Sequence, residues 1–210
     1  MLNDEINKMK FYPIVDNFEW IKKLVSWNVQ TIQLRIKNNP FLDKTEMNHI
    51  ESEIKNSIEY CKRKNCQLFI NDHWELALKY NAFGIHLGYE DSFHADIPKI
   101  YKTKIKLGLS THDDNELSHA LKLNPSYIAL GPIFPTKTKI MKFLPQGIEK
   151  ITEWRKKIPK QIPLIAIGGI KLENSIQIYQ SGADSISVIH DFLHATDPEN
   201  RIKSWLKLGQ

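Results

Sequence analysis

Residues 127–139 read YIALGPIFPTKTK, a short apolar run followed at once by a loop of proline, threonine and lysine. An apolar run of this length that ends at glycine and proline is typical of a buried strand. The loop brings hydroxyl and ammonium groups to the end of that strand, and such donors bind phosphate. The stretch therefore indicates a strand that carries a phosphate-binding loop, although a solvated basic turn would have the same composition.

The same alternation of apolar runs and amphipathic segments occurs eight times, about 26 residues apart (210 divided by eight). This pattern predicts βα units, and eight of them predict an α/β fold, a single-domain (β/α)8 TIM barrel over residues 1–210. Residues 1–9 are expected to form a flexible N-terminal extension, and an open parallel sheet is the alternative architecture. The expected strands are 11–15, 31–37, 67–71, 84–88, 105–109, 127–131, 164–167 and 185–189. The expected helices are 17–27, 45–64, 74–80, 95–102, 115–122, 148–157, 172–180 and 198–208.

The composition is that of a globular protein, with 41% hydrophobic and 25% charged residues. No apolar run approaches the ~18 residues that a membrane helix needs, and the polar start lacks the apolar core of a signal peptide, so we expect a cytoplasmic protein. Cys61 and Cys66 are the only cysteines, which excludes a disulfide framework and predicts two reduced structural residues. The net charge of +5 comes from scattered lysines, which favours small anionic substrates over nucleic acid.

The second expected strand, 31–37, reads TIQLRIK. A strand period of two places Gln33, Arg35 and Lys37 on one face and three apolar residues on the other. In a barrel the apolar face meets the helices, so the polar face points into the barrel. Buried cations are costly unless an anion is bound nearby, which predicts a ligand site; a salt-bridged edge strand is the alternative.

Oxygen ligands follow the third and fourth expected strands. Asn71 and Asp72 end the third strand in INDHW, and Glu90 and Asp91 follow the fourth in GIHLGYED. Carboxylates on neighbouring strands can share one Mg2+ ion with substrate phosphate oxygens. The alternative is that the aspartates are N-caps of the helices that follow.

Further candidates stand at the ends of the remaining strands. Ser110, in LGLSTHDD, can orient a substrate or cap a helix, whereas His86 lies within a strand and is expected to be a wall histidine. Gly168 and Gly169 follow the seventh strand. Glycines there permit phosphate to approach backbone N–H groups, as often happens after strands seven and eight of such barrels.

The motifs together resemble those of the thiamine-phosphate synthase family. The resemblance covers residues from about 11 to 206 and rests on the blocks YPIVD, IQLRIK, LFIND, GIHLG, LGLSTHDD, YIALGPIFPT with TK, PQG and IAIGGI, which occur in the family's order. It implies a (β/α)8 barrel that joins a pyrimidine diphosphate to a thiazole phosphate with Mg2+ as cofactor. Two small-molecule substrates are then the partners, with no nucleic acid and no membrane, and a homo-oligomer stays possible.

The resemblance also implies roles for individual residues. Asp72 and Asp91 would hold Mg2+, Gln33 would contact the pyrimidine, and Ser110 would lie near the leaving group. Diphosphate would be bound by Arg35, Lys37, Asn71 and Lys139, and Arg35, Ser110 and Lys139 would be the catalytic residues. The thiazole phosphate would be held by Thr136, Thr138, Gly169 and the backbone of Val188 and Ile189.

Two departures from the family pattern lie at this site. Tyr89 stands where the family usually has glutamine, and His190-Asp191 replaces a small serine-alanine pair. One alternative function is a thiazole tautomerase-like isomerase, with His112 as a proton-transfer group. The other is a non-catalytic relative that binds phosphorylated metabolites.

Overall fold

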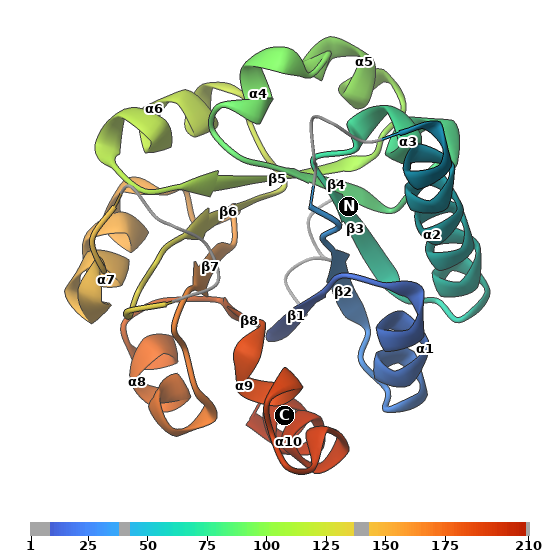
Figure 1. Ribbon diagram of the computed structural model, residues 1–210. Coiled ribbons are helices and arrows are strands. Elements are labelled where there is room, and N and C mark those ends of the chain that lie inside the picture. Colours follow the sequence, from blue (N-terminus) through green and yellow to red (C-terminus); the bar gives the residue numbers. More distant parts are fainter. Residues whose placement is uncertain (1–8, 38–42, 137–142, 209–210) are drawn as a thin grey trace.

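Eight parallel strands close into a barrel, and helices form a ring around it (Figure 1). The computed structural model describes residues 9–37, 43–136 and 143–208. Each strand pairs in parallel with the next along the chain, and β8 closes the sheet by pairing with β1. The predicted (β/α)8 barrel is therefore confirmed, and the open sheet is excluded.

The strands are short and regular: β1 (Phe11–Val15), β2 (Thr31–Leu34), β3 (Gln67–Asn71), β4 (Gly84–Leu87), β5 (Lys106–Thr111), β6 (Tyr127–Leu130), β7 (Leu164–Ile167) and β8 (Ser185–Val188). The helices are α1 (Phe18–Ser26), α2 (Lys44–Arg63), α3 (Trp74–Lys79), α4 (Asp91–His94), α5 (Ile97–Lys102), α6 (Asp114–Lys122), α7 (Gly147–Lys157), η1 (Leu172–Asn174), α8 (Ser175–Gln180), α9 (His190–Leu193) and α10 (Pro198–Leu208).

Every predicted strand exists, but some boundaries were wrong. β2 ends at Leu34 rather than at residue 37, and beyond it Arg35 keeps only one backbone hydrogen bond to β1. The predicted helix 172–180 divides into η1 and α8. The single-turn helices α4 and α9 were missed, since four residues are too short to show helical periodicity.

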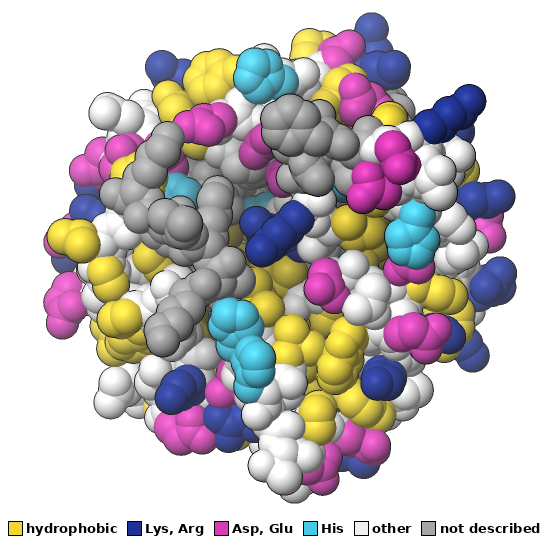
Figure 2. Space-filling view, viewed as in Figure 1, with side chains coloured by type: hydrophobic (Ala, Val, Ile, Leu, Met, Phe, Trp, Pro, Cys, Tyr) yellow, Lys and Arg dark blue, Asp and Glu magenta, His cyan; other side chains and the backbone are white. Residues whose placement is uncertain are grey.

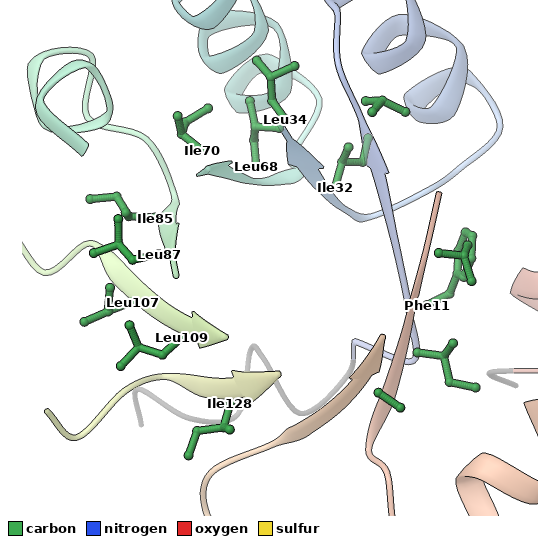
Figure 3. Close-up of a cluster of buried hydrophobic side chains, with 14 of the residues drawn as sticks. Phe11, Ile32, Leu34, Leu68, Ile70, Ile85, Leu87, Leu107, Leu109 and Ile128 are labelled. Carbon is green, nitrogen blue, oxygen red and sulfur yellow. The ribbon is translucent and has the colours of Figure 1, made fainter. Parts of the chain in front are cut away.

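Strand residues alternate between two hydrophobic layers. The outward side chains pack against the helices and include Ile32, Leu34, Leu68, Ile70, Ile85, Leu87, Leu107 and Leu109 (Figure 3). These side chains are buried almost completely, so the strand–helix interface is the main core. This layer confirms that the apolar face of β2 meets the helices.

A smaller cluster fills the inside of the barrel. Tyr12, Phe69 and Tyr127 meet edge to face, with ring centroids 5.2 to 5.8 Å apart. Glycines make room for them: a Cβ at Gly84 would lie 2.3 Å from the Phe69 ring, and one at Gly108 would lie 2.0 Å from the Tyr127 ring. The barrel is thus a packed core, with aromatic rings opposite glycines.

The predicted N-terminal extension falls mainly on residues 1–8, which lie outside the described residues. Met9 is buried beside the interior aromatic rings. Cys61 and Cys66 are buried free thiols, as predicted, and the contact with Cys66 together with burial raises the pKa of Cys61. Within the described ranges, no helix is long and apolar enough to cross a membrane.

Candidate functional site

A cavity of about 650 Å3 opens at the carboxyl ends of the strands, where Figure 2 shows a hollow bordered by basic, acidic and histidine side chains. Ten of the predicted site residues line it: Gln33, Arg35, Asn71, Asp72, Asp91, Ser110, Thr136, Gly169, Val188 and Ile189. They come from seven loops or strand ends distributed around the barrel. Thr138 and Lys139 lie outside the described residues, so their predicted roles stay predictions.

The β2 end supplies the cationic side of the cavity. Gln33 is buried on the inner face of β2, and Arg35 lines the cavity although it is the first residue after the strand. The Arg35 backbone N–H donates to the Val15 carbonyl at 2.7 Å, which holds this residue against β1. The prediction that the strand period extends to Lys37 was wrong, because Lys37 is exposed and is not among the residues that line the cavity.

Asp72 and Asp91 do not act as the N-caps that the alternative interpretation required. The N-cap residues of α3 and α4 are His73 and Glu90, and neither helix has a side-chain capping bond. Asp72 has a φ of 62°, in the left-handed region, and a Cβ at Gly88 would lie only 2.6 Å from Asp91 Oδ2. The backbone is therefore strained at Asp72, and the Asp91 carboxylate lies close against Gly88.

Two carboxylates fit a Mg2+ site that substrate completes. Within the described ranges, no group of three or more His, Cys, Asp or Glu could hold a metal alone. Mg2+ typically takes one or two carboxylates and keeps the other positions for water and substrate phosphate. The oxygen donors of Asp72 and Asp91 match that preference, and both side chains line the same cavity.

Ser110 is held by a chain of hydrogen bonds along the cavity floor. Its Oγ lies 2.7 Å from His86 Nε2, and His86 Nδ1 lies 2.7 Å from the Tyr127 hydroxyl. Helix α6 is capped instead by Asp113, which accepts from the Glu116 N–H at 2.9 Å. Ser110 is therefore not the cap of that helix, and His86 is the satisfied wall histidine that the sequence predicted.

The β6–β7 side carries the segment expected to bind phosphate. After β6 the chain forms a cis peptide between Gly131 and Pro132 and then runs beside the end of β7, where the Phe134 N–H donates to Gly168 O at 3.0 Å. Gly169 has a φ of 66°, and a Cβ there would lie 2.5 Å from Pro135 O. Glycine is thus required at this position both for its backbone angle and for the close approach of the loop.

His190 and Asp191, which depart from the family pattern, have different surroundings: one lines the cavity and the other binds a helix. His190 lies at the cavity wall, with its ring 4.9 Å from that of His194, and burial and His194 lower the pKa of His190. Asp191 instead binds α10: its carboxylate accepts from Arg201 at 2.7 and 2.8 Å and from Trp205 Nε1 at 2.7 Å. The acidic charge at the predicted phosphate loop is therefore neutralised by an ion pair.

The sequence named His112 as a candidate, but it missed the cavity residues Glu116 and Phe143 beside it and two tyrosines beneath the cavity. Glu116 Oε2 accepts from His112 Nδ1 at 2.7 Å, and the His112 ring stacks on that of Phe143 with centroids 4.7 Å apart. Tyr12 and Tyr127 lie below the cavity on inward strand positions. The period-two pattern that identified Gln33 would have identified both tyrosines, had it been applied to 11–15 and 127–131.

We expect His86 to make stability depend on pH. Burial, with a smaller contribution from Arg35, lowers the pKa of His86 from 6.5 to about 3. The unfolded chain therefore binds a proton below pH 6.5 that the native protein does not, so stability falls as pH falls from 6.5 toward 3. Between pH 7 and pH 5 the expected loss from this residue is about 2 kcal/mol. Urea unfolding at both pH values should show it, and His86→Gln should reduce the difference by that amount; an equal pH difference in the variant would contradict the assignment.

Comparisons with known proteins agree with this geometry. The family described as Thiamine monophosphate synthase matches residues 11–192. The chain is 43% identical over 196 residues to a thiamine-phosphate synthase of Rhizobium etli, covering 93% of each chain, and 41% identical over 201 residues to that of Pectobacterium atrosepticum, covering 96% and 92%. It superposes on the thiamine phosphate pyrophosphorylase of Pyrococcus furiosus with a TM-score of 0.80 and 25% identity, covering 98% of both chains. The chain therefore belongs to the thiamine monophosphate synthase family.

Proposed function

We propose that this protein is a thiamine-phosphate synthase, a transferase that joins 4-amino-5-hydroxymethyl-2-methylpyrimidine diphosphate to 4-methyl-5-(2-hydroxyethyl)thiazole phosphate and releases pyrophosphate. One observation carries the proposal: a single cavity of about 650 Å3 has a cation, amide and carboxylate side at β2 to β4 and a threonine and glycine side at β6 to β8. A cavity of this size can enclose two small reactants at once. Each side suits one phosphorylated reactant.

The diphosphate belongs on the β2 to β4 side. Arg35 and Asn71 face it from the cavity wall, Lys139 is assigned as an additional cation, and Gln33 contacts the pyrimidine. Lys37, which does not line the cavity, is not assigned to the diphosphate. Asp72 and Asp91 would hold Mg2+, which when bound neutralises charge on the departing diphosphate. Arg35 adds a fixed positive charge that needs no reorganisation as the bond breaks.

The thiazole phosphate belongs on the β6 to β8 side. Thr136 offers a hydroxyl and Gly169 a backbone N–H, and Thr138 is assigned to the same group. The backbone of Val188 and Ile189 completes this side. In the described part of the chain, no hydrogen bond uses the N–H of Gly169 or Ile189 as its donor, so both are available to an anion.

The reaction requires the protein to position two reactants and to stabilise the charge of the leaving group, and it needs no protein nucleophile. Departure of the diphosphate leaves a pyrimidine-stabilised cation, which the thiazole nitrogen then traps. Holding two reactants in one cavity converts their encounter into an intramolecular event. All residues assigned here belong to one chain, so a homo-oligomer would not be needed to complete the site. A cytoplasmic location remains our expectation.

Turnover tests the proposal directly. Purified protein with both phosphorylated precursors and Mg2+ should release pyrophosphate and thiamine phosphate in equal amounts, and omission of either precursor should abolish both products. Binding of both precursors without product, under any divalent metal, would instead favour a non-catalytic phosphometabolite-binding protein.

A second candidate is a thiazole tautomerase-like isomerase. The observation in its favour is the paired His112 and Glu116 at the cavity wall, since a carboxylate fixes a histidine ring for proton transfer. An isomerase would act on a thiazole phosphate alone and would not use Asp72 or Asp91. Isomerisation without the pyrimidine, unaffected by substitution of both aspartates, would favour this candidate.

A further inference from the structure

We propose that Gln33, Tyr12, Tyr127, His86 and Ser110 form a directed hydrogen-bond relay that fixes the Ser110 hydroxyl as a donor toward the leaving diphosphate. The relay is a property of the free protein. Its catalytic consequence rests on the proposed function.

The relay crosses the barrel floor from β2 to β5. Gln33 Nε2 lies 3.1 Å from the Tyr12 hydroxyl, which lies 2.9 Å from the Tyr127 hydroxyl. Tyr127 then meets His86 Nδ1 at 2.7 Å, and His86 Nε2 meets Ser110 Oγ at 2.7 Å. Five strands, β2, β1, β6, β4 and β5, each contribute one member. Gln33 is also a hydrogen-bonding neighbour of Tyr127, and among the described residues the Tyr12, His86 and Ser110 side chains hydrogen-bond only within this group.

Because the relay is buried, each of its hydroxyl protons needs an acceptor within the relay. Tyr12 and Tyr127 are 1% and 0% exposed, and His86 is 5% exposed. Each phenol has one proton to donate, and a buried phenol proton without an acceptor is unfavourable. The relay therefore adopts the direction in which every buried proton finds an acceptor.

Only one direction satisfies that condition with Gln33 as the donor. Tyr12 accepts from Gln33 and can donate its own proton only to Tyr127. Tyr127 then donates to His86 Nδ1. In the opposite direction Tyr12 would accept from both neighbours, and its own proton would have no acceptor in the described part of the chain.

The His86 imidazole transmits this direction to Ser110. The ring is buried, and its Nδ1 accepts the Tyr127 proton and so carries none of its own. The ring proton is therefore on Nε2 and is donated to Ser110 Oγ. The Ser110 proton is then directed into the cavity, which Ser110 lines. A departing diphosphate offers the oxygen acceptor that this proton lacks in the described protein.

Tyr12, Tyr127 and His86 are thus positioning residues that act through Ser110. A hydroxyl held as a donor needs no reorientation when negative charge develops on the leaving group. With an untethered serine, the hydroxyl could also accept, and the stabilisation would be weaker. The expected benefit appears in kcat rather than in KM, because the charge grows as the bond breaks.

The first experiment reads the direction without substrate. In protein labelled with 15N-histidine, the His86 ring should show a protonated Nε2 and an unprotonated Nδ1 from pH 6 to pH 8. A protonated Nδ1, or a doubly protonated ring, would overturn the relay. This result does not depend on turnover, so it separates a failure of the relay from a failure of the proposed function.

The second experiment is a double-mutant cycle. Tyr127→Phe and Ser110→Ala should each lower kcat about tenfold with KM changed less than about twofold, and the double variant should also lose only about tenfold. A loss near a hundredfold in the double variant would mean independent effects and would overturn the coupling. Tyr179→Phe is the matched control: its hydroxyl donates to Lys10 O at 2.6 Å, outside the cavity, and its removal should not alter kcat. Thermal unfolding of each variant checks that the barrel is intact.

Discussion

Asp72→Asn and Asp91→Asn should each lower kcat/KM for thiamine phosphate synthesis about a thousandfold, which corresponds to roughly 4 kcal/mol of transition-state stabilisation. The physical reason is that each substitution removes one of the two carboxylates that would hold Mg2+ against the diphosphate. Asparagine is the appropriate replacement at Asp72 because the φ of 62° is tolerated by asparagine and strained for alanine. Steady-state release of pyrophosphate measures the effect, and the Mg2+ concentration for half-maximal rate should rise in both variants.

Glu90→Gln is the matched control for these variants. Glu90 precedes Asp91, lines the same cavity and carries the same charge. The sequence offered both as oxygen ligands, but the metal is assigned to Asp91. Its neutralisation should change kcat/KM less than tenfold. Equal losses in Glu90→Gln and Asp91→Asn would show that general negative charge, and not a defined metal ligand, is what the site needs. Activity unchanged in Asp72→Asn or Asp91→Asn would remove the metal assignment for that residue.

Asp191→Ala should reduce the free energy of unfolding by about 3 kcal/mol. The Asp191 side chain is only 3% exposed and accepts hydrogen bonds from Arg201 and from the indole of Trp205. Its removal leaves the guanidinium and the indole N–H partly buried without these acceptors, although Glu173 still binds Arg201. The contact ties α9, beside the cavity, to α10, the last helix in the described chain. Urea unfolding at pH 7 measures the loss.

Glu199→Ala provides the comparison on the same helix. Glu199 pairs with Lys203 one turn later, and both side chains are about half exposed. An exposed pair of this kind contributes about 0.5 kcal/mol or less, because solvent screens it. If Asp191→Ala were no more destabilising than Glu199→Ala, the Asp191 ion pair would not anchor α10.

Sequence patterns located the strands because side chains of a barrel strand alternate regularly between the helix-facing side and the interior. Apolar residues such as Ile32 and Leu34 face the helices, so Gln33 between them must face inward. The same reasoning placed Asn71, Asp72 and Ser110 at strand ends, and all of them line the cavity. It failed at Lys37, because periodicity in the sequence continues where the hydrogen bonding of β2 has already stopped.

The sequence could not choose between two uses of one side chain. Aspartate before a helix is both a good N-cap and a good metal ligand, and serine before an acidic segment is both a cap and a substrate donor. The structure excludes the cap role for Ser110, because Asp113 caps α6 while Ser110 turns to His86. It also shows that Asp191, which the sequence placed at a phosphate loop, forms an ion pair with Arg201.

The sequence by itself determined the eight repeats, the inward polar face of β2, the family and ten of the residues that line the cavity. These follow from short-range periodicity and from residue types at strand ends, which are properties of local sequence. Only the tertiary structure decided that Tyr127, the first residue of the stretch YIALGPIFPTKTK, joins Tyr12 and His86 beneath the cavity. The reason is physical: barrel closure brings β1, β4 and β6 together across the interior, and burial there leaves each polar group only the partners that closure supplies.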